Sequence, residues 1–229
     1  YHFIILYNIF KMNHLELFSG THSFGKVSSK LGYNVYSLDR DLGAKCPFTD
    51  YESENHFKED IMTWDYKQYP KGFFKVITAS PVCMWWSHLR RSWIGRKLKS
   101  HGDKIITEEI LDEDIEKYGV PMVEKIFEII DYFNPDYYII ENPKNGKMKE
   151  YINDLIPYYD VDYCMYSDFG YRKTTRFWTN IQGLEFNKCN HKKHKFALGH
   201  LNHGTNLLQK YRIPEKVIKK FFNAIIQNL

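Results

Sequence analysis

The chain has 229 residues, of which 43% are hydrophobic and 26% are charged, and its formal net charge at pH 7 is +4. This length is enough for one domain with a large buried core, and four cysteines without a CxxC spacing argue against a disulfide framework. The apolar run at residues 3–10 is too short to cross a bilayer. We therefore expect an intracellular protein in a reducing compartment, whose mildly basic balance permits nucleic-acid binding without requiring it.

Two segments interrupt an otherwise regular pattern and define the expected domain organisation. Residues 1–11 are interpreted as an extension, because Met12 offers an alternative start. Residues 12–229 are predicted to form a single domain. Within it, residues 88–118 form an insert that is basic in its first part and acidic in its second, and residues 181–210 are polar and typical of a loop.

Short apolar runs alternate with stretches of helical spacing along the chain. A helix is expected after the first strand, another at 120–133 and a last one at 213–229, which begins at Pro214. The predicted strands are 14–18, 33–39, 56–60, 73–80, 136–142, 158–167 and 176–180. This alternation predicts an α/β fold with a mostly parallel, doubly wound sheet, in which ligands bind at the carboxyl ends of the strands.

The first expected strand leads into a turn of small residues, in the stretch LELFSGTHSFG (15–25). Small residues let a ligand approach the backbone, and the following helix offers free N–H groups at its start. Asp39 ends the second strand about twenty residues later, where a carboxylate can accept hydrogen bonds from ribose hydroxyls. The structural alternatives are an ordinary strand-to-helix connection for the loop and a turn or cap residue for Asp39.

The stretch ITASPVCMWWS (77–87) places Cys83 just past an apolar strand and behind Pro81, where a loop begins. A cysteine thiolate is a strong nucleophile. An inert, packed thiol is the commoner role of a lone intracellular cysteine. The position alone does not decide between the two.

Two further strand ends carry charged residues. Glu141 ends the buried strand of IIENP, where partial desolvation raises a carboxyl pKa and suits it to donate a proton. Arg176 opens the apolar strand of DFGYRKTTRFWTN (168–180), an unusual place for a charge unless it serves a partner. An ordinary turn for Glu141 and a salt bridge for Arg176 are the alternatives.

Taken in this order, the four motifs resemble those of the DNA (cytosine-5)-methyltransferase family in its compact, phage- and virus-type form. LELFSGTHSFG resembles the loop that binds S-adenosylmethionine, SPVCMWWS the Pro-Cys loop, IIENP the Glu-Asn motif and GYRKTTRFWTN the segment with a base-contacting arginine. The last helix resembles the C-terminal helix of many members. The resemblance covers nearly all of residues 14–226, and the Cys loop with the Glu-Asn motif is its most specific pair.

The resemblance implies a Rossmann-like, S-adenosylmethionine-dependent methyltransferase fold and methylation of cytosine C5 in DNA. The Cys83 thiolate would attack C6 of a cytosine flipped out of the duplex, Glu141 would hold and protonate N3, and Arg176 would contact O2. The implied cofactor-binding residues are Phe18, Gly20, Thr21, His22, Ser23, Asp39, Asp60, Ile61, Ser80 and Pro81.

The same resemblance indicates where nucleic acid would bind, since family members close on DNA next to the catalytic loop. Lysines and arginines there would neutralise phosphates, and a solvated surface loop is the alternative. A zinc site within 188–203 is disfavoured because the spacing is irregular and only one thiolate is present, so no metal is expected and phosphate contacts are preferred. The candidate nucleic-acid-binding residues are Arg90, Arg91, Arg96, Lys97, Lys99, Lys192, Lys193 and Lys195.

The chain departs from the family pattern in four places. The Cys loop reads Pro-Val-Cys-Met where compact members more often have Pro-Pro-Cys and a polar residue, and the arginine motif lacks the usual Gln-x-Arg and keeps only Arg176 in register. The cofactor loop reads Gly-Thr-His-Ser where Gly-x-Gly-Gly is usual, and only about thirty residues separate Asn180 from Tyr211, where the family carries a much larger target-recognition domain. Two alternatives therefore stay open, a catalytically silent nucleic-acid-binding relative and a methyltransferase acting on RNA such as tRNA. We expect a monomer that binds duplex DNA and no membrane, in the cytoplasm or nucleus of a host cell.

Overall fold

A computed structural model describes residues 12–152, 154–195 and 207–229, so the expected extension at 1–11 lies outside the described residues. Seven strands form one sheet in the order β3-β2-β1-β4-β5-β7-β6. Only β7 runs against its neighbours, so the expected mostly parallel α/β sheet is confirmed. The strands are β1 (Asn13–Leu17), β2 (Asn34–Leu38), β3 (Asn55–Phe57), β4 (Phe74–Ala79), β5 (Tyr137–Pro143), β6 (Tyr158–Asp162) and β7 (Thr174–Thr179).

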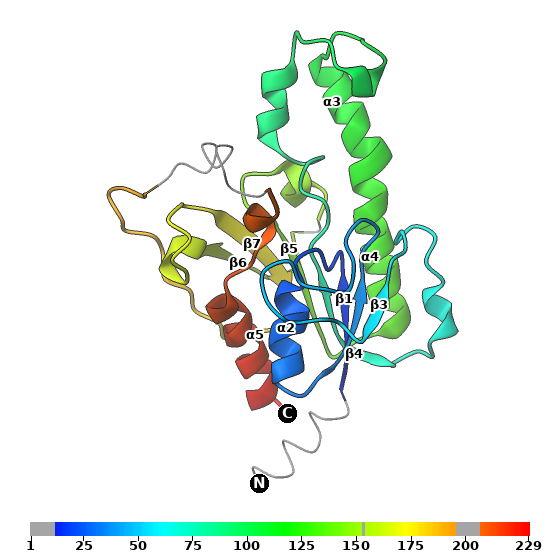
Figure 1. The fold of residues 1–229 in the computed structure, drawn as a ribbon, viewed down its shortest axis with the longest axis vertical. Coiled ribbons are helices and arrows are strands. Elements are labelled where there is room, and N and C mark those ends of the chain that lie inside the picture. Colours follow the sequence, from blue (N-terminus) through cyan, green and yellow to red (C-terminus); the bar gives the residue numbers. More distant parts are fainter. Residues whose placement is uncertain (1–11, 153, 196–206) are drawn as a thin grey trace.

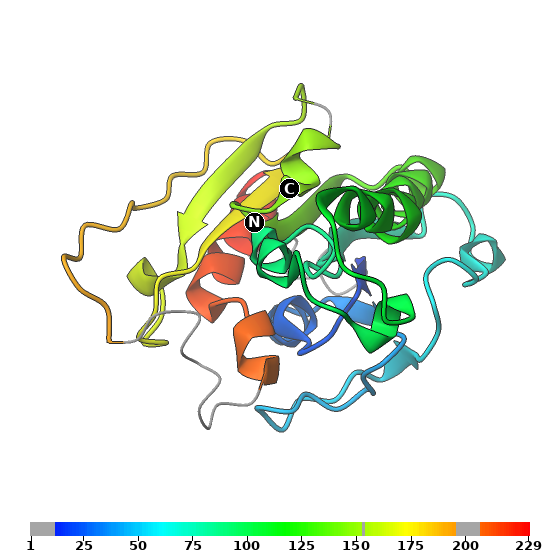
Figure 2. The ribbon, with the colours of Figure 1, turned by 90° about the horizontal axis from the view of Figure 1, so that it is seen from above.

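Helices cover both faces of the sheet (Figures 1 and 2). Helices α2 (Ser23–Lys30) and α5 (Glu215–Gln227) pack side by side on one face, and α4 (Val120–Phe133) lies on the other. The two layers bury separate apolar clusters, one around Phe177 and Phe221 and one around Ile77, Ile126 and Phe133. These clusters hold the strands in register, so the polar strand ends meet along one edge.

The helix boundaries follow from local sequence. Helix α4 has Pro121 in its first turn, where the missing N–H costs nothing, and it ends at Asn134 in the left-handed conformation. Helix α5 begins directly after Pro214, as expected, and buries one apolar side.

The insert at 88–118 forms an arm that projects beyond the sheet (Figure 1). It contains the 3-10 helices His88–Trp93 and Lys99–His101 and helix α3 (Glu108–Asp114), which continues through a π-helical turn (Ile115–Gly119) into α4. Its basic and acidic parts pair with each other rather than forming two separate charged surfaces. The pairs are Arg90 with Asp114, Arg91 with Glu108 and His101 with Asp114.

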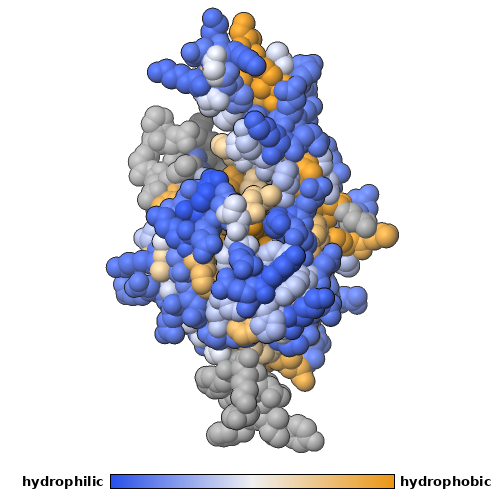
Figure 3. All heavy atoms as spheres, turned by 90° about the vertical axis from the view of Figure 1, so that its right-hand side faces the viewer, coloured by the Kyte–Doolittle hydropathy of each residue, from blue (hydrophilic) through white to orange (hydrophobic). Residues whose placement is uncertain are grey.

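The arm also presents apolar side chains to solvent. Leu89, Ile94 and Ile105 are exposed, and Figure 3 shows apolar surface at the end of the molecule where the arm lies. Among the described residues, no helix combines the length and the apolar character needed to cross a membrane.

Candidate active site

The carboxyl ends of β1, β4 and β5 are joined by hydrogen bonds that bring the predicted motifs together. The backbone N–H of Ser80 donates to the Leu17 carbonyl (3.2 Å). The buried Asn142 amide donates to the Pro81 carbonyl (2.9 Å), which fastens the Cys loop to the strand end that carries Glu141. The Asn of the Glu-Asn motif therefore has a direct structural role.

Glu141 is 7% exposed and faces groups that hold its carboxyl. The Tyr163 hydroxyl donates to Glu141 Oε1 (3.3 Å), and Lys173 Nζ lies 3.9 Å from the same oxygen. Burial raises the pKa of the Glu141 carboxyl, and this outweighs the lowering by Lys173 and by hydrogen bonds from Tyr163 and Ser80. The raised pKa makes Glu141 a better proton donor to a base than an exposed glutamate.

Cys83 lies close enough to Glu141 and Lys173 for both to influence its thiol electrostatically. Burial raises the pKa of the Cys83 thiol, Lys173 lowers it and Glu141 raises it. Burial and the neighbouring Cys83 together raise the pKa of Tyr211. The resting residue is therefore a thiol, and Lys173 is the cation that favours its thiolate.

Two tryptophans fix the loop that follows Cys83. Trp86 is 1% exposed, and its carbonyl accepts a hydrogen bond from the Lys147 backbone (2.8 Å). A Cβ at Gly119 would lie 2.8 Å from a Trp86 ring carbon, so only glycine fits there. The Trp85 ring stacks on Tyr118 at 4.6 Å. Both tryptophans therefore tie the Cys loop to the base of the arm.

Arg176 points away from Glu141, contrary to the sequence-based expectation. It pairs in register with Asn142, while Phe177 pairs with Glu141, so the two-residue period of a strand points Arg176 to the other face of the sheet. There its guanidinium forms two hydrogen bonds with Asp160 (2.7 and 3.0 Å) and lies over the Tyr158 ring. The salt-bridge alternative describes Arg176 correctly.

The predicted cofactor loop has an unusual backbone. Phe18, Gly20 and His22 all have positive φ angles (54°, 49° and 53°), a conformation that non-glycine residues adopt mainly where function or tertiary contacts require it. Beneath the loop, the Glu16 carboxylate accepts hydrogen bonds from the backbone N–H groups of Phe24 and Gly25. Glu16 thereby satisfies the first turn of α2 in place of a local cap.

His22 lies under the loop, although the bulkier Gly-Thr-His-Ser sequence predicts that its side chain fills part of the cofactor pocket. Its side chain is fully buried, with Nε2 2.9 Å from the Gly43 carbonyl and Nδ1 3.5 Å from Glu16. Burial lowers the pKa of His22, but the Glu16 carboxylate and the Gly43 carbonyl together raise it above its ordinary value. The histidine is a support of the loop, and its ring is not available to a cofactor.

The remaining predicted cofactor residues lie at neighbouring strand ends. Asp39 accepts hydrogen bonds from the backbone of Gly20 (2.8 Å), Asp41 and Leu42, so it shapes the loop while a carboxylate retains further acceptor capacity. Asp60 pairs with Arg40 at 3.3 Å. Ile61 is buried in the core next to it, and Ser80 and Pro81 adjoin Glu141.

A cavity of about 730 Å³ opens beside the start of α2, within the usual size range of ligand pockets. Thr21 and Ser23 line it, together with the cations Lys26 and Arg212, which suit a carboxylate-bearing ligand. The nearby Ser19 hydroxyl is buried and lacks a hydrogen-bond partner. The carboxylates Asp168 and Glu215 also line this cavity, whereas Asp39, Asp60, Ile61, Cys83 and Glu141 do not.

The chain is similar to the "Probable DNA (cytosine-5)-methyltransferase" of Frog virus 3 (isolate Goorha), with 36% identity over 227 residues covering 90% of this chain and 97% of the viral protein. The chain belongs to the DNA (cytosine-5)-methyltransferase family. Membership confirms the resemblance, the fold class and the expected cofactor, S-adenosylmethionine. No protein-family model matches the chain.

Solved structures with a similar fold include the Dnmt2 methyltransferase of S. pombe (TM-score 0.45, 15% identity, 76% of this chain) and a Spodoptera frugiperda DNMT2 mutant (TM-score 0.42, 17% identity, 73% of this chain). This methyltransferase aligns with about half of each of those chains, 51% and 49%.

The candidate nucleic-acid-binding residues of this methyltransferase separate into two groups. Arg90 is 3% exposed and bonds Asp114 and the carbonyls of Trp85 and Leu111, so it is a structural residue of the arm and not a phosphate contact. The others are exposed, and Arg91 forms a surface ion pair with Glu108. The exposed candidates are Arg91, Arg96, Lys97, Lys99, Lys192, Lys193 and Lys195.

Three residues of the candidate site are not among those predicted from the sequence. Lys173 stands three positions before Arg176, in the same motif, and its spacing relative to the strand would have placed it on the Glu141 side. Glu16 is an acid inside an apolar strand, which signals a buried partner. Tyr163 carries no sequence signal, because tyrosine is common throughout this chain.

Proposed function

We propose that this methyltransferase transfers a methyl group to C5 of cytosine in DNA through a covalent bond between Cys83 Sγ and C6 of the base. The observation that carries the proposal is that Lys173 lies 3.9 Å from the Glu141 carboxylate and that both residues act electrostatically on the Cys83 thiol, at the ends of strands tied together by Asn142. A nucleophile and a proton donor then face one base from neighbouring loops.

The chemistry follows from the two side chains. The Cys83 thiol loses its proton to solvent, and the thiolate forms a bond to C6 while Glu141 gives a proton to N3, which gives C5 the character of an enamine. S-adenosylmethionine supplies the methyl group to C5. Solvent then removes the C5 proton, whose electron pair forms the C5–C6 double bond as the Cys83–C6 bond breaks and the thiolate leaves, and N3 returns its proton to Glu141.

Lys173, and not Arg176, is the cation beside the two reactive side chains. Its ammonium lies 3.9 Å from Glu141, interacts with the Cys83 thiol and donates to the Lys210 carbonyl (3.0 Å). A fixed cation beside the nucleophile stabilises the thiolate at the moment of attack. Lys173 is therefore proposed as the residue that activates Cys83.

DNA is the proposed substrate because the Frog virus 3 relative, named a probable DNA methyltransferase, aligns over 97% of its length. The exposed cations of the arm follow the Cys loop directly, where they can contact phosphates. The segment between β7 and α5 is much shorter than the family's recognition domain. The competing possibilities are therefore an RNA substrate and a catalytically silent relative.

The test measures transfer of the labelled methyl group from S-adenosylmethionine to three polymers: cytosine-containing duplex DNA, the same duplex with every cytosine replaced, and tRNA. The proposal predicts label in 5-methylcytosine of the first duplex alone. Transfer to tRNA alone would assign RNA as the substrate. Cofactor and DNA binding without transfer to either polymer would identify a silent relative.

A further inference from the structure

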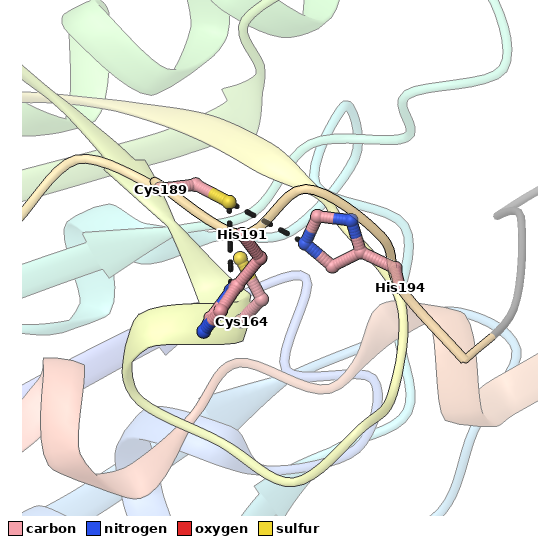
Figure 4. Close-up of side chains that lie close together, drawn as sticks. All are labelled: Cys164, Cys189, His191 and His194. Atoms are coloured by element: carbon pink, nitrogen blue, oxygen red, sulfur yellow. Dashed lines mark hydrogen bonds between the residues drawn. The ribbon is translucent and has the colours of Figure 1, made fainter.

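Four side chains with metal-binding atoms meet beside the end of β6 (Figure 4). Cys164 belongs to the 3-10 turn Tyr163–Met165, and Cys189, His191 and His194 come from the segment that follows β7. One donor atom from each lies within 4.8 Å of all the others. The mechanism proposed above uses none of the four.

The distances match a tetrahedral ion with mixed ligands. Cys189 Sγ lies 3.6 Å from His191 Nδ1 and 3.4 Å from His194 Nε2. Zinc bonds of about 2.3 Å to sulfur and about 2.0–2.1 Å to nitrogen place such ligand atoms about 3.6 Å apart at tetrahedral angles. The two histidines therefore present their nitrogens at the spacing that a zinc ion requires.

We infer that Cys164, Cys189, His191 and His194 bind one structural zinc ion. Two thiolates and two neutral imidazoles complete a closed tetrahedral set, which leaves no open position for catalysis. The two thiolates balance the charge of the ion, so the site forms without another acidic group.

Protein contacts outside the four ligands hold the segment in place. Asp162 accepts a hydrogen bond from the Cys189 backbone (2.8 Å), and Tyr166 accepts one from the Asn187 backbone (2.7 Å). Phe186 packs against Phe221 of α5. These contacts bring Cys189, which follows β7 in the chain, next to Cys164, which precedes it. Because Cys164 lies outside residues 188–203, that segment alone contains only one thiolate ligand.

The ion would order a segment that has no helix or strand of its own among its described residues, 180–195. Exposed Lys188, Lys192 and Lys193 lie on it, beside or between the ligands. The metal would thus fix the positions of basic side chains in the part of the chain that replaces the family's larger recognition region.

The first experiment measures metal in the tag-free full-length protein by mass spectrometry after gel filtration. We expect about one zinc per chain, lost in Cys164→Ser and in Cys189→Ser and retained in Cys83→Ser, which removes a thiol outside the cluster. An unchanged zinc content in Cys164→Ser would overturn this ligand set.

Cobalt substitution tests the same four ligands through the spectrum of the bound metal. Cobalt bound to the wild-type chain should show the d–d bands of a tetrahedral site and a thiolate charge-transfer band, and both should be absent in His194→Ala with an unchanged far-ultraviolet circular dichroism spectrum. Zinc should also slow tryptic cleavage after Lys192. An octahedral cobalt spectrum, or a Cys164–Cys189 disulfide in freshly purified protein, would contradict the proposal.

Discussion

At the scale of single residues, one cation, Lys173, interacts with both the buried acid Glu141 and the nucleophile Cys83. Lys173 lowers the pKa of both Cys83 and Glu141, while burial raises both. Its Nζ is itself held by the Lys210 carbonyl and lies 5.1 Å from the Tyr163 ring centre. The protonation states of the two reactive groups are therefore coupled through Lys173.

Replacing Lys173 by Met should slow alkylation of Cys83 by iodoacetamide. Without the cation the thiol pKa rises further above its ordinary value of 9.0, and a thiol whose pKa is higher by about one carries about a tenth of the thiolate at a pH below both values. Peptide mapping measures modification of Cys83 across a pH series. Lys173→Arg should keep the rate near wild type, and so should Lys144→Met, which removes a lysine paired with Asp160. An equal loss in Lys144→Met would contradict the assigned role.

Glu141→Gln should separate catalysis from stability. Because the folded protein holds the Glu141 proton more tightly than the unfolded chain, its contribution to stability is complete below the ordinary pKa of 4.5 and falls as pH rises towards the raised native value. Gln should remove that decrease while lowering kcat by about 10²–10⁴-fold. Urea denaturation at several pH values measures the free energy of unfolding of the wild type and of Glu141→Gln. Glu108→Gln, at an exposed glutamate, is the control. A Gln variant with an unchanged pH slope would refute the protonated state.

Residue roles are predictable from the sequence only where a motif carries them. Cys83 and Glu141 stand at strand ends in a recognisable order, and the structure brings them together. The expectation for Arg176 rests on its place at the start of a strand, but side-chain alternation decides its face, and that depends on register with β5. Cys164 gives no signal in the sequence because its partners lie beyond β7 in the chain.

At the scale of elements, the arm behaves as a support for the Cys loop as well as a charged surface. Arg90 is buried against Asp114 and stacks near Trp85 and Trp93, while Trp86 fills the space above Gly119. Arg91, the next residue, points to solvent and pairs with Glu108. Adjacent arginines thus have opposite roles, which a charge pattern cannot distinguish.

Arg90→Met should lower the free energy of unfolding by about 3–5 kcal/mol, because it leaves Asp114 half-paired in a buried position. Arg91→Met removes an exposed ion pair and should cost only about 0–1 kcal/mol. Urea denaturation of both variants provides the matched comparison. Equal decreases in the free energy of unfolding for Arg90→Met and Arg91→Met would show that Arg90 has no special structural role.

At the scale of the whole molecule, the fold was the most predictable property. Alternating apolar runs fixed the strands of a mostly parallel sheet, and the two amphipathic segments at 120–133 and 213–229 became the covering helices α4 and α5. The arm was not predicted as a helical element, because its stability comes from pairing between two charged segments that are distant in sequence.

Exposed cations on the arm should govern the salt dependence of DNA binding. Lys97→Met should reduce the slope of log affinity against log salt by about 0.9 if Lys97 contacts one phosphate. Lys75→Met is the control, since Lys75 lies at the opposite end of β4 and pairs with Asp136. Fluorescence anisotropy at several salt concentrations measures both slopes. Equal changes in the two variants would place the DNA elsewhere.

The most direct test of the central claim traps the bond between the protein and the base. The enzyme is incubated with S-adenosylmethionine and duplex DNA carrying 5-fluorocytosine, whose C5 cannot lose a proton, so the final elimination is blocked. We predict a denaturation-resistant adduct whose nucleotide maps to Cys83 by peptide mass spectrometry and which is absent in Cys83→Ser. Methyl transfer by Cys83→Ser at the wild-type rate, or an adduct mapped to another cysteine, would contradict the account.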